Sequence, residues 1–402
     1  MLAAITGVGE TTMARSLPDR TPLSLACEAA ILALADAGVP VGEVDGILTF
    51  EGGAFSPYAD GRPFNPRGHL QVAETLGIDN AAFAAVTQMG GATPGFLLAT
   101  ARAAVLEGRC RHVLVVGAGK MGPARRSAGG RATTDALASF NGHSINYEQP
   151  FGPLMVTYYA AVAQRHMYEF GTTPEQLAAI AVACRRHASL NPNAVYRDPI
   201  TVADVLTSRM ISSPLRLLDC CVASDGGSAW VVSSERAVAE ARSRPVWILG
   251  CGYAQSDYFL GALCRGAEGF DLVRSVGSRA GAMAFGEAGV TPAEIDVAEI
   301  YDSFTICALM GLEDFGFCAK GEGGPFAAAR ELELGGRLPL NTHGGLLSGQ
   351  HFGPGGVMHY TEAVRQLRGE GGRRQVEGAR LAFAGSIAGV CSTYSGAVLA
   401  AG

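Results

Sequence analysis

The sequence predicts an α/β protein built from two similar halves, residues 1–240 and 241–402, whose sheets carry helices on their faces. Three observations lead to this fold class. One segment of the chain recurs later, apolar strand-type runs alternate with helical stretches, and 402 residues suffice for two or three domains with a large core. Apolar residues make up 48% of the chain and charged residues 17%, a balance that excludes a disordered protein.

The internal repeat favours a duplicated unit. Residues 37–45 and 288–296 both begin with Ala-Gly-Val, both end with Glu, an aliphatic residue and Asp, and both lead into a β-type run. Segments 5–9 and 248–252 also match, with glycines in the same places. Because the two matches occur in the same order, they indicate a duplicated α/β unit. Their offsets of 251 and 243 residues differ by eight, so we expect a loop insertion.

The first half begins with strand and helix signals in alternation. The start of the chain lacks a basic region and a long apolar stretch, so we interpret it as a short buried strand ending in a Gly turn and not as a signal peptide. Residues 95–107 are rich in Ala and Leu and predict a helix. Residues 112–117 form an apolar run bounded by Gly, typical of a strand that is buried on both faces.

Residues from about 121 to 225 interrupt this regularity and predict a loop domain inserted in the first half. They contain helical segments near 156–169 and 174–188, followed by a region punctuated by Pro. A long insertion in a compact enzyme is often a lid or a binding loop. The linker between the halves is expected near residues 236–246, where a helical stretch ends before a Pro.

The second half repeats the alternation. Residues 357–368 predict a helix, and residues 380–384 and 396–400 predict strands.

Charge and composition narrow the class of function. The net charge is −6 and no basic stripe occurs, which argues against a nucleic-acid partner. No apolar run approaches the ~20 residues of a membrane span, so a cytoplasmic protein is expected. The ten cysteines show no CxxC pair and no zinc-type spacing, which favours reduced thiols and no metal site.

Several strings carry a family resemblance. In the second half these are residues 299–304, 312–325 and 341–351, and the first half adds 187–194 and 217–227. Together they resemble the sterol-carrier-protein-type thiolases, often called lipid-transfer proteins, over nearly the whole chain. The resemblance implies a five-layered αβαβα thiolase fold with two similar halves, and a homodimer. It also implies an acyl-CoA substrate with no further cofactor, and a small DUF35 partner protein with an OB-fold and a zinc ribbon.

The resemblance places the nucleophilic cysteine of thiolases at Gly91. That cysteine normally begins a helix, where the dipole lowers the thiol pKa. We expect Met89, Gly90 and Gly91 to line an oxyanion pocket, because glycine permits a close backbone approach to a ligand. The missing side chain is expected to leave room for a bulky substrate. Thr87 and Thr93 carry the only hydroxyls of this turn, and neither has an evident activating base.

The remaining candidates lie in the second half. His351 aligns with the histidine of the family's Gly-His-Pro motif and is expected to bind the oxyanion or to move a proton. Tyr301 stands where relatives carry Asn or His and is our candidate general acid or base, although a base would need a lowered pKa. His343 is a second catalytic candidate or a brace for its Gly turn. Asp302 is a catalytic candidate or a turn cap. Gly385 begins a Gly-rich segment at the place of the family's second cysteine and is expected to line the pocket.

Without a nucleophile, the sequence predicts a lyase. The favoured reaction is retro-aldol cleavage of a β-hydroxyacyl-CoA through an enolate that preorganised donors stabilise, with a steroid side chain as one candidate substrate. One alternative is a thiolase or acetyl-CoA acyltransferase whose nucleophile lies elsewhere. The other is a non-catalytic acyl-CoA-binding subunit of a complex.

Overall fold

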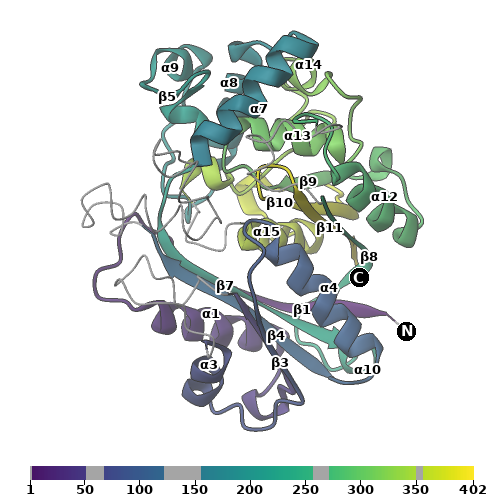
Figure 1. The fold of residues 1–402 in the computed structure, drawn as a ribbon. Helices are drawn as coiled ribbons and strands as arrows, with labels where there is room; N and C mark the ends of the chain where they lie inside the picture. The colour runs from purple at the N-terminus through teal and green to yellow at the C-terminus, as the bar shows by residue number, and fades with distance from the viewer. Residues whose placement is uncertain (1, 51–67, 122–154, 257–270, 350–355) are drawn as a thin grey trace, which may run out of the picture.

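The structure is a computed structural model and describes residues 2–50, 68–121, 155–256, 271–349 and 356–402. It has the five layers that the resemblance implies: helices, a sheet, central helices, a second sheet and outer helices (Figure 1). Each half of the chain contributes one of the two sheets. They meet edge to edge where Ala4 and Ile5 pair with Trp247 and Val246, so one hydrogen-bonded ladder runs through nine strands.

The sheet of the first half has five strands, with two helices on its outer face. The helices are α1 (Pro22–Ala37) and α3 (Gly68–Leu76). In spatial order the strands are β3 (Phe83–Thr87), β2 (Gly46–Phe50), β4 (His112–Lys120), β7 (Asp225–Ser234) and β1 (Ala3–Glu10).

The sheet of the second half continues from β1 with four strands. Its outer face carries α12 (Gly277–Ala288) and α13 (Thr305–Asp314). The strands are β8 (Val246–Gln255), β11 (Thr393–Ala401), β10 (Leu381–Ala388) and β9 (Val297–Ile300). A parallel bridge between Ala298 and Leu340 takes the place that β3 has in the first half.

Two helices form the central layer and contact strands of both halves. They are α4 (Thr93–Leu106) and α15 (Val357–Arg368). Both agree with the helices that the sequence predicts, as do the strands expected at 112–117, 380–384 and 396–400.

The duplication extends to the packing of β1 on α1 and of β8 on α12. A methyl group on either glycine of each matched pair would collide with the backbone of an alanine in the facing helix. Small residues therefore let the helix approach the strand closely in both halves. The contacts are Gly7 with Ala33, Gly9 with Ala29, Gly250 with Ala284, and Gly252 with Ala280. The glycines are offset by 243 residues and the alanines by 251. The second half therefore has eight more residues between the strand β8 and the helix α12 than the first half has between β1 and α1.

The predicted insertion contributes a helical layer at the top of Figure 1. Its second helix begins with a capping box, in which the Thr173 side chain accepts from the Gln176 amide and Pro174 occupies the first turn. Its elements are α7 (Met155–Phe170), α8 (Pro174–Ala188), α9 (Val202–Thr207), β5 (Met210–Ser212) and β6 (Leu215–Arg216). From the second half, α14 (Gly323–Ala328) packs on α8. Between β7 and β8 lies the short α10 (Glu235–Val238).

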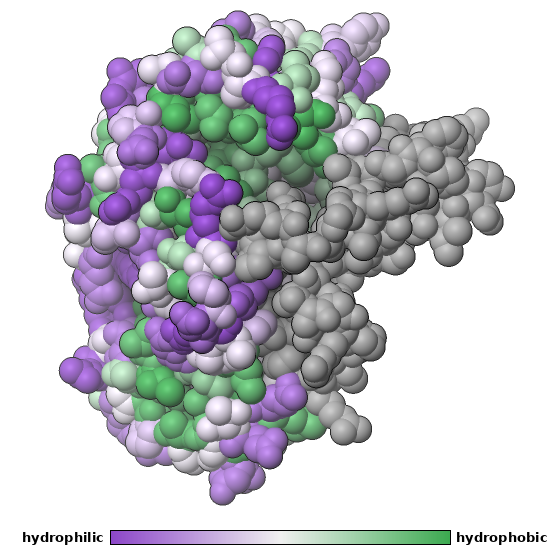
Figure 2. Space-filling view, turned by 90° about the vertical axis from the view of Figure 1, so that its left-hand side faces the viewer, coloured by the Kyte–Doolittle hydropathy of each residue, from purple (hydrophilic) through white to green (hydrophobic). Residues whose placement is uncertain are grey.

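On the face drawn in Figure 2, apolar patches near the top and the bottom are separated by hydrophilic residues. Large exposed apolar side chains include Ile31 and Leu32 on α1 and Leu70 on α3. Among the described residues, no helix has both the length and the apolarity that crossing a membrane requires.

Candidate active site

The turn between β3 and α4 carries no cysteine, and its buried hydroxyl, that of Thr93, is engaged in hydrogen bonds. The Thr93 hydroxyl is buried and donates to the Gly90 carbonyl at 2.7 Å, and it accepts the Met89 amide at 2.8 Å. Gly90 has a φ of +58°, which favours glycine. Its amide donates to Gln88 Oε1 at 3.1 Å, so this N–H, which we expected to serve the oxyanion, already has an acceptor. The turn is therefore closed by its own hydrogen bonds.

Tyr301 fills the space beside Gly91. A Cβ built on Gly91 would lie 2.6 Å from the Cε2 and Cζ atoms of the Tyr301 ring and would also collide with the Ile387 carbonyl. No real Cβ makes contacts this short, so a cysteine cannot stand at position 91 in this arrangement. The expectation of extra room for substrate at Gly91 is thus wrong, because an aromatic ring from the other half occupies it.

The Tyr301 side chain is buried and stays protonated over the ordinary pH range. It follows β9, and its amide donates to the Gly385 carbonyl at 2.9 Å. Burial, with Cys221 nearby, raises the pKa of the phenol well above its ordinary value of 10.0, although a hydrogen bond with Ser303 opposes the shift. The raised pKa favours a proton-donating role and argues against the base role that we left open.

Gly385 is placed differently from our expectation. It lies within β10, and a Cβ there would stand 2.6 Å from a ring carbon of Phe315 and 2.9 Å from one of Phe383. Its missing side chain therefore serves the aromatic core of the second half, and its carbonyl holds the Tyr301 backbone. His351 lies outside the described residues, so its expected role stays a prediction.

A buried carboxylate precedes Tyr301 by two residues. Glu299 Oε1 accepts the amide and the hydroxyl of Thr342, at 2.9 and 2.7 Å, and Oε2 lies 2.8 Å from His343 Nδ1. Burial by itself would lower the pKa of His343, but the Glu299 charge and hydrogen bond raise it above 6.5. The second nitrogen of His343, Nε2, is buried and has no hydrogen-bond partner in the described part of the chain.

A second buried carboxylate follows Tyr301 directly. Asp302 is fully buried; its Oδ1 accepts the Leu346 amide at 2.8 Å, and its Oδ2 accepts the Leu347 amide at 3.4 Å. Oδ1 also lies 3.2 Å from Nε2 of His359 on α15. The imidazoles of His359 and His343 meet edge to face, with centroids 4.8 Å apart. Asp302 thus caps the segment after Asn341, which agrees with its expected capping role.

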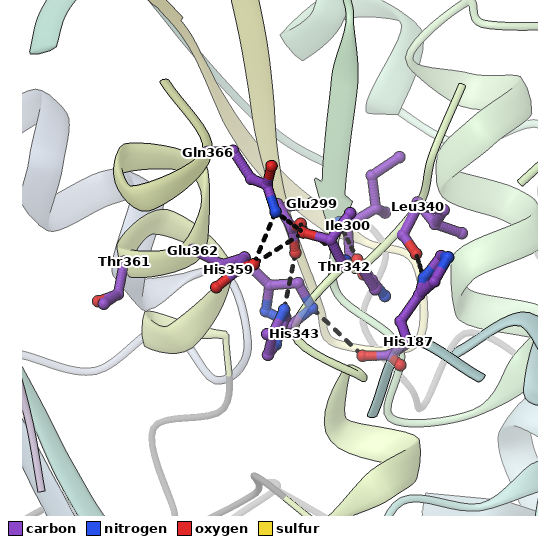
Figure 3. A network of polar contacts seen from close by, with 12 residues as sticks. His187, Glu299, Ile300, Leu340, Thr342, His343, His359, Thr361, Glu362 and Gln366 are labelled. Atoms are coloured by element: carbon purple, nitrogen blue, oxygen red, sulfur yellow. Dashed lines mark hydrogen bonds and ion pairs between the residues drawn. The ribbon is translucent and has the colours of Figure 1, made fainter. Parts of the chain in front are cut away.

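Beyond the residues that Figure 3 labels, an ion pair of Glu362 with Arg374 completes the network. Arg374 donates to both oxygens of Glu362 at 2.8 Å, and Gln366 donates to Glu362 Oε1 at 3.0 Å. The Thr342 hydroxyl lies 2.9 Å from the same Oε1 and so stands between the two glutamates. Burial opposes ionisation of Glu362, but Arg374 outweighs it and lowers the Glu362 pKa to about 2.

Six members of this network were not predicted: Glu299, Thr342, His359, Glu362, Gln366 and Arg374. Two signals could have found four of them. One is a glutamate inside an otherwise apolar strand. The other is the spacing of His359, Glu362 and Gln366 on one face of α15.

The duplicated fold and the turn without a nucleophile define a thiolase-fold protein that lacks the thiolase nucleophile. Residues 267–401 match the family described as "Thiolase C-terminal domain-like". A steroid side-chain-cleaving aldolase of Thermomonospora curvata is 35% identical, over 91% of this chain and 90% of that protein. The 17-hydroxy-3-oxo-4-pregnene-20-carboxyl-CoA lyase of Mycobacterium tuberculosis is also 35% identical, over 91% of this chain and 92% of that one.

A solved structure titled "Ltp2-ChsH2(DUF35) aldolase" superposes with a TM-score of 0.83 at 32% identity, covering 100% of this chain and 98% of that chain. The chain belongs to the thiolase superfamily, in its branch of sterol-carrier-protein-type thiolases.

Proposed function

We propose that this protein is a thiolase-like carbon–carbon lyase that cleaves a β-hydroxyacyl-CoA by a retro-aldol reaction, without a covalent acyl-enzyme. The observation that carries this proposal is the Tyr301 ring packed against Gly91, the position where the family resemblance places the thiolase cysteine. The aldolase and lyase names of two relatives that align with nine tenths of the chain support the same reaction class.

The reaction needs a base, an acid and donors for an enolate, but no nucleophile. A base takes the proton of the β-hydroxyl, and the oxygen lone pair forms the new carbonyl as the Cα–Cβ bond breaks. The electrons of that bond pass to Cα and the thioester oxygen as an enolate, which is then protonated at Cα. Atoms balance without water or an oxidant. Each preorganised donor at the enolate oxygen contributes roughly 3–4 kcal/mol.

Tyr301 is our candidate proton donor. A phenol whose pKa burial has raised keeps its proton and can donate it, or a hydrogen bond, to the enolate. His351 is then the candidate base for the β-hydroxyl, which stays a sequence-based prediction. We expect no cofactor beyond the CoA of the substrate.

The substrate we propose is the CoA thioester of a steroid side chain with a hydroxyl at the β carbon. The M. tuberculosis relative is named for such a compound, whose 17-hydroxyl is β to the thioester carbonyl. Cleavage there would yield a 17-ketosteroid and a short acyl-CoA. We also propose a homodimer that binds a small DUF35 protein, since the solved aldolase with this fold carries DUF35 in its title.

The test is product analysis with the purified chain, alone and with a DUF35 protein, on a 17-hydroxysteroid-20-carboxyl-CoA without added CoA. We expect ketosteroid and acyl-CoA in equal amounts, and an unchanged intact protein mass during turnover. A trapped acyl adduct, or a need for free CoA, would indicate a thiolase instead. No turnover of any β-hydroxyacyl-CoA by the complex would favour a non-catalytic subunit.

A further inference from the structure

We propose that His343 and His359 are a pair of positioning residues for Tyr301, and that each acts through the buried carboxylate it binds. This inference rests on the proposed function, because it assigns Tyr301 as the group that donates a proton to the reacting substrate. His359 carries no expectation from the sequence, and His343 becomes a positioning residue where we had considered a catalytic one.

The two carboxylates flank Tyr301 along the chain. Glu299, two residues before it, binds His343 at 2.8 Å, and Asp302, one residue after it, lies 3.2 Å from His359. These two contacts fix the chain on both sides of Tyr301, so its backbone cannot shift without breaking one of them. The two histidines lie together below Glu299 in Figure 3.

The same contacts join three separate pieces of chain. Glu299 lies in β9 and Asp302 just after it, His343 lies in the segment after Leu340, and His359 lies in α15. The segment is fixed further because Asn341 bonds the Ile300 backbone on both sides, donating to its carbonyl at 2.8 Å and accepting its amide at 2.7 Å.

The start of α15 is also a wall for Tyr301. A Cβ on Gly356, the residue before the helix, would lie 3.3 Å from the Tyr301 ring. Holding α15 through His359 therefore holds one side of the space that the ring occupies. The other side is Gly91.

The hydrogen-bond pattern fits a positioning role. A carboxylate only accepts hydrogen bonds, so His343 Nδ1 and His359 Nε2 must both carry hydrogen. The opposite ring nitrogens, His343 Nε2 and His359 Nδ1, are buried and lack a partner among the described residues. Among the described residues, each imidazole thus makes its hydrogen bond to a carboxylate. Both residues are buried, with His343 2% and His359 0% exposed.

The test compares variants that keep or remove the bonding N–H. His343→Asn places an amide N–H where Nδ1–H stands, and His359→Gln does so for Nε2–H; His343→Leu and His359→Leu remove it. On the active complex we expect the Leu variants to lower kcat about 10- to 100-fold with KM little changed, because a small misplacement of a catalytic group has this effect. The Asn and Gln variants should recover most of that loss.

A second readout does not depend on activity. In His359→Leu, hydrogen exchange at the Leu346 and Leu347 amides should accelerate at least tenfold, since their acceptor Asp302 loses its anchor. The matched control is His166→Leu. His166 is a buried histidine of α7, and its Nε2 lies 2.9 Å from Glu313 Oε2. The substitution should lower stability but leave both kcat and these two amides as in the parent protein.

Two outcomes would overturn the proposal. One is a folded His359→Leu variant with the parent kcat and unchanged exchange at Leu346 and Leu347. The other is a His359→Gln variant as impaired as His359→Leu, which would mean that the imidazole itself moves a proton. If the parent protein cleaves no β-hydroxyacyl-CoA, the proposed function fails, while the exchange experiment still decides whether the histidines fix this segment.

Discussion

The two halves of the molecule share a scaffold but differ at the strand that ends in the site. With the offset of 251 residues, β2 corresponds to β9, so Leu48 corresponds to Glu299 and Phe50 to Tyr301. Leu48 and Glu299 are both fully buried. Burying a carboxylate costs several kcal/mol unless it is paired. The second half therefore needs Thr342 and His343 as partners where the first half needs only apolar packing.

The connection that leads into the central helix also differs between the halves, and again the second half is the more polar. In the first half, residues 88–92 link β3 to α4 in one tight turn. In the second half, residues 341–356 lie between Leu340 and α15, and this longer connection supplies the polar partners of β9. The duplicated fold provides the frame, and one lengthened loop with polar residues at one strand end provides the site.

The largest effect on activity is expected when Tyr301 is replaced by phenylalanine, the residue at the corresponding position 50 of the first half. Tyr301→Phe should lower kcat by about 10²–10⁴-fold, because a proton donor at the enolate is lost while the ring still fills its space. Steady-state cleavage of the steroid thioester measures it. Tyr360→Phe is the matched control, since Tyr360 is also a buried tyrosine, and its hydroxyl lies 3.2 Å from Ser386. Equal losses in both variants would refute the assignment.

Replacing Glu299 by leucine, the residue at the corresponding position 48 of the first half, tests the role of the buried carboxylate. Glu299→Leu leaves His343 and Thr342 without their acceptor, so we expect the free energy of unfolding to fall by about 3–5 kcal/mol. Denaturant titration measures it. Leu48→Met in the first half is the control and should cost less than about 1.5 kcal/mol. A Glu299→Leu protein as stable as the parent would mean that the halves differ in composition but not in energetics.

The ion pair of Glu362 and Arg374 should make the free energy of unfolding depend on pH in the acidic range. Arg374 lowers the folded pKa of Glu362 to about 2 against an ordinary value of 4.5, so its stabilisation is present above pH 4.5 and is lost as the pH falls toward 2. In Glu362→Gln, this part of the acid dependence of unfolding should disappear. His343, whose folded pKa is raised, contributes in the opposite sense, with stabilisation present below pH 6.5 and lost as the pH rises through the folded value.

The smallest effect concerns the outer helices. The first half has Ala35 where α12 has Gly286, an exposed glycine with no atom within 4 Å of an added Cβ. Gly286→Ala should raise the free energy of unfolding by about 0.5–1 kcal/mol. Gly281→Ala in the same helix should gain less, since its Cβ would lie 3.2 Å from the Phe315 backbone. Thermal unfolding of both variants compares them, and an equal gain would contradict the packing.

Sequence patterns predicted the two similar halves and the helices of the central layer, because each depends on periodicity or on matching strings. The placement of the thiolase cysteine at Gly91 also came from matching strings and stays a prediction. Sequence patterns could not show that Tyr301 fills the space beside Gly91. These residues lie 210 positions apart on different halves, and their contact depends on how the sheets and central helices stack. The contacts of Glu299 with His343 and of Asp302 with His359 could not be predicted for the same reason, since the two histidines come from a loop and from α15.

The most direct test of this account is a double-mutant cycle on unfolding with Gly91→Ala and Tyr301→Asn. If the ring occupies the place of the cysteine, Gly91→Ala should destabilise the parent by about 1–3 kcal/mol. In the Tyr301→Asn background it should cost at least about 1 kcal/mol less, because the collision with the ring is gone while the one with the Ile387 carbonyl remains. The same cost in both backgrounds would contradict this account, because the Ile387 carbonyl would then set the whole cost and the Tyr301 ring none of it.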